Sequence, residues 1–251
     1  MGGRKPSAGG TLAVDAEYRA LVGAALAALV AGPAAAAECR LALALGMDVS
    51  RSVSRQDYAI QTGGLIDALT DREIRDAFLG PADFVALAVY EWSGEGYQVV
   101  TLPWAEIRSA ADLEAALATL RANLRLSDAY PTALGAGLAF GRQMLEARTD
   151  CAFRTLDISG DGRSNSGPPP GAVYERGGWG DITVNGLAIE QHEEGLTAYY
   201  RREVLRGPGA FVETARRHED FPAAFRRKLL RELTQAVVGR ADQAGPPARP
   251  G

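Results

Sequence analysis

The sequence has few of the residues that build covalent or metal-bound scaffolds, with two cysteines and two histidines among 251 residues. Two cysteines are too few for a cysteine-rich fold or for a closed structural zinc site, which needs four ligands. A strong positive charge is also missing, because 27 basic residues face 31 acidic ones and leave a formal net charge of −4. We therefore expect no general attraction to nucleic acid or to an anionic membrane surface.

Several catalytic signatures are absent as well. His192 and His218 could in principle serve a serine hydrolase, but no Gly-x-Ser-x-Gly segment is present. The sequence contains no Walker A loop, which leaves nucleotide hydrolysis without an anchor. An aspartyl phosphotransferase would carry a second carboxylate two residues after Asp48, where Ser50 stands. What remains is an ordinary globular composition, with 47% hydrophobic and 23% charged residues.

The N-terminal segment carries an uncharged apolar run at residues 21–31, which follows Arg4, Lys5 and Arg19. A Gly-Pro pair breaks the run, and four alanines at 34–37 offer the small residues that signal peptidase reads. The run is short for a membrane span and is typical of a secretory signal. We predict a signal peptide over residues 1–37 and a secreted, periplasmic chain with no membrane span after cleavage. The alternative is a buried alanine-rich helix.

Short apolar runs alternate with helical patterns along the rest of the chain. The expected strands cover residues 40–47, 84–92, 97–102, 153–158, 182–189 and 211–214, and the expected helices cover residues 54–69, 110–124, 133–148 and 222–238. Continuous apolar runs indicate strands that are buried on both faces. The alternation predicts an open α/β sheet with helices on both faces, within one domain over residues 38–239. Residues 240–251 are expected to form a disordered tail.

Two expected helix starts place side chains at one edge of this sheet. The segment 54–57 resembles a capping box, so a helix begins directly after the loop that follows Asp48. Another helix begins after Thr132, because Pro131 keeps residue 130 out of helical geometry. In a parallel sheet, the carboxyl ends of the strands and the following helix starts share the edge where ligands bind. The side chains expected to meet there are Asp48, Ser50, Ser52, Thr132 and Asp161.

These five side chains are all hard oxygen donors, with no histidine or thiol among them. Such a set favours Mg²⁺, Mn²⁺ or Ca²⁺ over zinc or copper. Two carboxylates balance a divalent cation to about zero, while hydroxyls add no charge. The cation would keep water ligands and could accept a carboxylate from another molecule. The chemistry therefore indicates binding.

The pattern resembles the von Willebrand factor type A domain and its metal-ion-dependent adhesion site. Residues 48–52 match the family's Asp-x-Ser-x-Ser, Thr132 resembles its separate threonine, and Asp161 with Gly162 resembles its later Asp-Gly pair. The resemblance covers residues 40–238 and implies a doubly wound, mostly parallel sheet in a Rossmann-type three-layer arrangement. It also implies that the two serines and the threonine contact the cation, the aspartates act directly or through water, and a partner's acidic side chain completes the coordination.

Other segments resemble a branch of bacterial secreted type A proteins of undefined function: residues 91–94, 157–162 and 207–211. Two residues depart from better-known members. Pro131 replaces the small residue before the threonine, which makes Ser127 the alternative to Thr132 as a ligand. Arg51 lies inside the motif, where it either attracts an acidic partner or is an ordinary solvated arginine.

The family's strand order bears on the two cysteines. Cys39 lies nine residues before Asp48, and Cys151 lies ten before Asp161. If both aspartates lie at one sheet edge, both cysteines lie at the opposite one, on strands that the family places side by side. The resemblance therefore implies a Cys39–Cys151 disulfide, which an oxidising compartment would form. The alternative is two unrelated buried thiols.

Together these features predict a non-enzymatic, secreted domain that binds a protein partner through a divalent cation. One alternative is a hydrolase that uses the same cation to activate water, although the sequence offers no evident general base beside the cluster. The other alternative is a structural domain whose cation only ties loops together.

Overall fold

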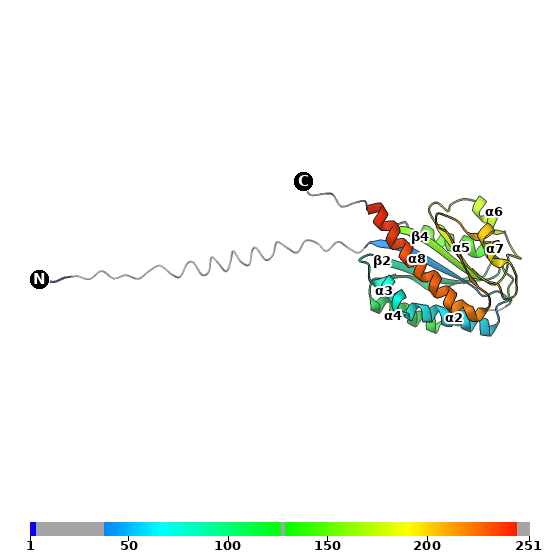
Figure 1. Cartoon of the computed structure of the whole chain (residues 1–251), viewed down its shortest axis with the longest axis horizontal. Coiled ribbons are helices and arrows are strands. Elements are labelled where there is room, and N and C mark those ends of the chain that lie inside the picture. Colours follow the sequence, from blue (N-terminus) through cyan, green and yellow to red (C-terminus); the bar gives the residue numbers. More distant parts are fainter. Residues whose placement is uncertain (4–37, 127–128, 245–251) are drawn as a thin grey trace. The chain divides into compact units, whose positions relative to one another are not determined.

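The computed structural model describes residues 1–3, 38–126 and 129–244 of the chain (Figure 1). Apart from residues 1–3, the expected signal peptide lies outside these ranges, and so does Ser127. Within the described ranges, no helix has both the length and the apolar composition that crossing a membrane would need.

A six-stranded sheet with the order β3-β2-β1-β4-β5-β6 forms the centre of the domain. Its strands are β1 (Cys39–Asp48), β2 (Phe84–Trp92), β3 (Gln98–Ile107), β4 (Cys151–Gly160), β5 (Thr183–Ile189) and β6 (Val212–Ala215). All neighbouring pairs are parallel except β2 and β3, because β3 joins the edge of the sheet in the antiparallel direction. The chain therefore has the doubly wound, mostly parallel sheet predicted from its sequence.

Helices cover both faces of the sheet and complete a three-layer arrangement (Figure 1). One face carries α2 (Arg55–Thr70), α3 (Arg72–Leu79), α4 (Ala110–Ala122) and α8 (Phe221–Ala244). The other carries α5 (Leu134–Glu146), α6 (Pro170–Glu175) and α7 (Leu196–Tyr199), which a π-helical turn extends over Tyr200–Val204. A 3₁₀ turn at His218–Asp220 directly precedes α8.

The central strand β1 shows how one sequence serves both faces. Its alternating leucines belong to the apolar cluster under α2 and α8, and the alanines between them belong to the cluster under α5. Successive side chains of a strand point to opposite faces, so this alternation follows from the pleat. Small residues suit the second face because α5 lies close to the sheet: a Cβ atom added at Gly141 would lie 2.5 Å from Leu156 Cδ1.

Two sequence-based boundaries need correction. Helix α8 continues through Gly239 to Ala244, so residues 240–244, which were expected to begin a disordered tail, are helical. Strand β3 extends through Pro103 to Ile107 instead of ending near residue 102. Proline is tolerated there because an edge strand has one side without ladder partners.

A buried lysine fixes α8 to the sheet. Lys228 Nζ lies 2.7 Å from Asp157 Oδ1 on β4 and 2.7 Å from Glu232 Oε1 on its own helix. Asn185 of β5 donates a further hydrogen bond to Glu232 (2.8 Å). Moving α8 along the sheet would separate Lys228 from Asp157 and leave an uncompensated buried charge, which is costly. These contacts therefore fix the position of α8 on the sheet.

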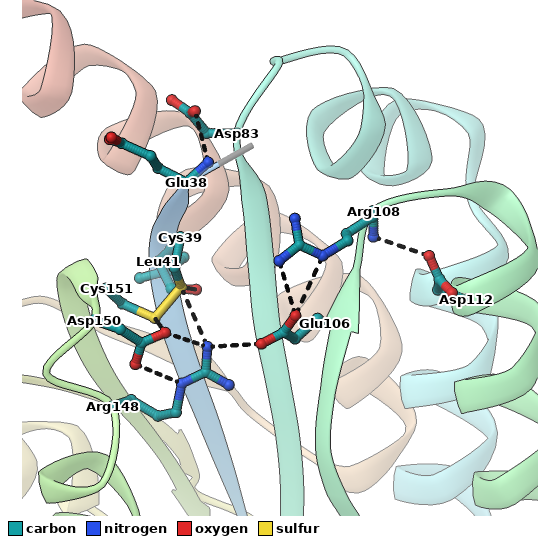
Figure 2. A network of polar contacts seen from close by, with 10 residues as sticks. All are labelled: Glu38, Cys39, Leu41, Asp83, Glu106, Arg108, Asp112, Arg148, Asp150 and Cys151. Atoms are coloured by element: carbon teal, nitrogen blue, oxygen red, sulfur yellow. Dashed lines mark hydrogen bonds and ion pairs between the residues drawn. A yellow bond between two sulfur atoms is a disulfide. The ribbon is translucent and has the colours of Figure 1, made fainter. Parts of the chain in front are cut away.

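A disulfide joins Cys39 and Cys151 at the amino-terminal ends of β1 and β4, where the two residues are register partners 4.5 Å apart at Cα. Figure 2 shows Arg148 beside it, with its guanidinium donating to Asp150 Oδ2 (2.8 Å) and lying 3.8 Å from Cys39 Sγ. The pairing implied by the resemblance is therefore present, at the end of the sheet opposite Asp48.

Reduction of this disulfide is expected to lower the free energy of unfolding by at most about 4–5 kcal/mol, because the bond closes a loop of 112 residues in the unfolded chain. Chemical denaturation with and without reductant measures the difference. A variant with both cysteines replaced by serine serves as control and should not respond to reductant. Identical denaturation midpoints for the oxidised and reduced wild type would contradict the expectation.

Candidate metal centre

The loop between β1 and α2 places the first group of candidate ligands. Asp48 ends β1, and the loop then turns through a backbone hydrogen bond from Val53 N to Ser50 O (3.0 Å). Ser54 caps α2 and forms the predicted capping box with Asp57. The helix start therefore closes the loop on its far side, so Ser50 and Ser52 are held in a short turn next to Asp48.

Hydrogen bonds link the candidate side chains into one chain. Thr132 Oγ1 lies 3.2 Å from Ser50 Oγ, and Ser50 Oγ lies 3.2 Å from Ser52 Oγ. Ser52 Oγ donates to Asp161 Oδ1 (2.6 Å). Asp48 joins through its Oδ1 atom, which accepts from the Ser50 backbone N–H (2.8 Å). The structure therefore brings together all five residues selected from the sequence.

Thr132, for which the sequence offered Ser127 as the alternative ligand, is held in place by hydrogen bonds of its own backbone. Its N–H donates to Asn165 Oδ1 (2.9 Å), and its carbonyl accepts from Asn165 N (2.9 Å). The following residue, Ala133, donates to Ser93 O (2.8 Å). These bonds connect the start of α5 to the loops after β2 and β4, so Thr132 is buried among the other candidates.

The two aspartates carry buried, unpartnered oxygens. Asp48 and Asp161 are 0% and 1% exposed, and the Oδ2 atom of each has no hydrogen-bond partner among the described residues. Burial raises the pKa of Asp48 to about 8, and the nearby charge of Asp161 adds to the effect. Burial also raises the pKa of Asp161, although the hydrogen bond from Ser52 opposes it. A positive charge placed beside these two buried carboxyl groups would therefore stabilise their ionised form.

Gly160 leaves room for the orphaned oxygen of Asp48. A Cβ atom added at this glycine would lie 2.9 Å from Asp48 Oδ2 and 2.6 Å from the Tyr200 hydroxyl. Both atoms lack a hydrogen-bond partner among the described residues. Any larger residue at position 160 would therefore press on the carboxylate. An all-oxygen cluster with two orphaned carboxylate oxygens suits a hard divalent cation, so the residues present fit such an ion.

The structure adds two residues that the sequence analysis did not place in the cluster. His218 follows β6, and its Nε2 atom lies 3.9 Å from Asp161 Oδ2, so a histidine borders the five candidate ligands. Asp57, known from the sequence only as a capping residue, lies with its Oδ1 atom 3.4 Å from His218 Nδ1. The available signal was the position of His218, four residues past the last expected strand and thus at the same sheet edge.

Two arginines brace the loops that carry the candidates. Arg51, inside the motif, donates through Nη2 to the carbonyl of Ala129 (3.0 Å), and its backbone N–H donates to Tyr130 O (3.0 Å). Arg125 donates to Val49 O (2.9 Å). These contacts connect the loop after β1 to the segment before Thr132, which gives Arg51 a structural role.

The sequence model of a family described as "Protein of unknown function (DUF1194)" matches residues 38–237. No curated protein matches the chain.

Several solved structures share the fold. Proximal thread matrix protein 1 (PTMP1) from the mussel byssus aligns with a TM-score of 0.58 at 13% identity, covering 80% of this chain and 49% of that one. A von Willebrand factor type A protein from Catenulispora acidiphila aligns with a TM-score of 0.54 at 18% identity, covering 78% and 43%. The von Willebrand factor domain of the type V pili tip protein Mfa5 from Porphyromonas gingivalis gives 0.55 at 9% identity, covering 81% and 97%.

The chain spans about half the length of the first two of these proteins. A further PTMP1 structure is described as having a zinc-occupied MIDAS motif, the metal-ion-dependent adhesion site (TM-score 0.54, 14% identity). At identities this low, the structural similarity shows a shared fold alone.

In a chelating buffer, the free energy of unfolding is expected to fall as the pH rises from about 4 to about 8. The raised pKa of Asp48 means that the folded chain keeps a proton there which the unfolded chain has released, so each step up in pH favours unfolding. Asp48→Asn removes this group, and its unfolding free energy should fall less steeply across the window. Urea denaturation at about pH 5 and pH 8 measures both slopes.

The control is Asp76→Asn, which removes a solvent-exposed carboxylate on α3 and should keep the wild-type slope. Equal slopes for Asp48→Asn and wild type would show that Asp48 titrates normally.

Proposed function

The chain belongs to the DUF1194 family of proteins of unknown function, it has the von Willebrand factor type A fold, and we propose that it is a secreted protein-binding domain that depends on a divalent cation. Its candidate ligands are Asp48, Ser50, Ser52, Thr132 and Asp161. The observation that carries the proposal is their convergence from three loops at one sheet edge, with one buried carboxylate oxygen of each aspartate unpartnered.

The balance of charge indicates what such a cluster does. Two carboxylates match the charge of one divalent cation, and the three hydroxyls add oxygen atoms without adding charge. An ion bound there supplies a Lewis-acidic position that a carboxylate from another molecule can occupy. The role of the five side chains is to hold the ion at the surface edge of the sheet, so the partner we propose is a protein that presents an aspartate or glutamate.

The related structures and the disulfide support this proposal. PTMP1 has a form described with zinc in its adhesion-site motif, and Mfa5 is a pilus tip protein. A disulfide forms and persists in oxidising compartments, which agrees with a secreted, periplasmic chain.

The burial of His218 favours binding over hydrolysis. A metal-dependent hydrolase needs a general base that can reach the substrate. His218 lies beside Asp161, but its side chain is completely buried. It is therefore placed to act on the cluster and not on a bound molecule, so we propose no catalytic role for the chain.

We expect the chain to bind one divalent cation in calorimetric titrations, and Asp48→Ala to abolish the saturable signal because it removes a carboxylate on which the ion depends. Asp76→Ala is the matched control, since it deletes an exposed carboxylate on α3 and should leave binding unchanged. Full cation affinity in Asp48→Ala would refute the site.

Binding of an acidic protein partner should require the cation. Once a partner is found, capture on immobilised chain should be lost in chelator and in Asp48→Ala, and restored by the cation only in the wild type. Capture that is indifferent to chelator would favour a scaffold whose ion only ties loops together.

A further inference from the structure

His218 lies where the sheet edge meets α8, and the surroundings of its two ring nitrogens differ. The side chain is 0% exposed and is supplied by the 3₁₀ turn between β6 and α8. Its Nδ1 atom faces two oxygen acceptors from the loop after β5 and from α2. Its Nε2 atom faces the cluster described above and has no hydrogen-bond partner among the described residues.

The acceptors around Nδ1 assign it the ring proton. Gln191 Oε1 lies 3.2 Å from Nδ1 and also accepts from the His218 backbone N–H (2.9 Å). Asp57 Oδ1 lies 3.4 Å away on the same side. The other oxygen of Asp57 is engaged by the Ser54 hydroxyl (2.6 Å) in the capping box, which turns Oδ1 toward the histidine. Two acceptors require a donor between them, so the ring is oriented with Nδ1 protonated.

Nε2 is then a bare lone pair, and it faces another acceptor. Asp161 Oδ2 lies 3.9 Å from it, which is too long for a hydrogen bond, and this oxygen also lacks a partner among the described residues. Two buried acceptors that face each other without a proton are costly. A metal ion binds nitrogen at about 2.0–2.1 Å and oxygen at about 2.0–2.2 Å, so two ligands of one tetrahedral ion lie about 3.3–3.5 Å apart. A movement of about 0.5 Å would therefore bring both atoms into coordination distance of one ion.

We propose that His218 Nε2 and Asp161 Oδ2 are ligands of the same ion, the one that the proposed function requires. An imidazole in the ligand set shifts preference from Mg²⁺ and Ca²⁺ toward zinc-like transition metals. Asp57 and Gln191 act as the outer partners that a metal-bound histidine usually has, because they fix the tautomer and the ring orientation. The inference rests on the proposed function and specifies its cation as Zn²⁺ or an ion of similar chemistry.

A second arrangement competes with this one. Asp57, His192 and His218 each offer a ligand atom, and these atoms lie within 4.8 Å of one another, so they could hold a separate ion. That arrangement does not include Asp161, so it would leave the orphaned Asp161 Oδ2 unmatched. His192 is exposed and lies with Nε2 3.1 Å from Gln191 Nε2. The observations therefore favour the shared ion.

The direct test is nuclear magnetic resonance of the chain with ¹⁵N-labelled histidine, which is simple because the sequence has two histidines. Titration with Zn²⁺ should give His218 Nε2 the large shift of a metal-bound nitrogen at one equivalent, while neither His192 with Zn²⁺ nor either ring with Mg²⁺ shows a shift of that size. A Zn²⁺ titration that saturates without this shift at His218 Nε2 would overturn the proposal. Metal-bound shifts at both histidines would overturn it in favour of the second arrangement.

Variant affinities give an independent test. We expect His218→Gln to weaken Zn²⁺ binding by more than about 100-fold and Asp57→Asn by about 10–100-fold, with little change for Mg²⁺. His192→Gln is the matched control and should bind Zn²⁺ like the wild type; circular dichroism and thermal melting confirm that each variant is folded. An unchanged ratio of Zn²⁺ to Mg²⁺ affinity in folded His218→Gln would overturn this inference alone. A wild type that binds neither cation would overturn the proposed function with it.

Discussion

The parallel register of β1 against β4 is the constraint on which both ends of the domain depend. Cys39 lies opposite Cys151 at one end and Met47 opposite Ser159 at the other, so a single register aligns both the disulfide and the two aspartates that follow. The ends are about 30 Å apart along the strand. A slip of one residue would exchange the two faces of β1 and move Asp48 away from Asp161. The covalent bond therefore secures, from a distance, the alignment of the candidate metal ligands.

Two of the buried carboxylates, one on β4 and one just after it, have different surroundings. Asp157 lies inside β4 and meets the ammonium group of Lys228, which α8 delivers. Four residues later, Asp161 meets a serine hydroxyl through one oxygen, and its other oxygen faces the bare nitrogen of His218. In the first arrangement, the positive charge of Lys228 is shared by Asp157 and Glu232 and fixes a helix. In the second, a buried carboxyl oxygen has no such cation beside it at an edge where loops converge, which is the arrangement expected where an ion is to be bound.

Sequence reasoning recovered the parts that depend on local patterns. Apolar runs identified all six strands, and the residue types after β1, before α5 and after β4 identified the five residues of the candidate site. The short helix α3 was missed because its eight residues make about two turns, which is too short a segment for a helical period to be recognised. The end of α8 was misplaced because Gly239 and the glycine- and proline-rich residues after it are typical of a chain end. In each case the signal was local but weak.

His218 was missed for another reason, since its role depends on contacts that no local pattern encodes. Its ring is oriented by Gln191 from the loop after β5 and by Asp57 from the first turn of α2, and it faces Asp161 after β4. Asp57 was recognisable as a capping residue, yet the hydrogen bonds that cap the helix with one oxygen also direct the other oxygen toward the histidine. The same residue, Asp57, therefore determines both the start of α2 and the orientation of His218. A change in the capping box would act on both, although Ser54 lies outside the set of candidate ligands.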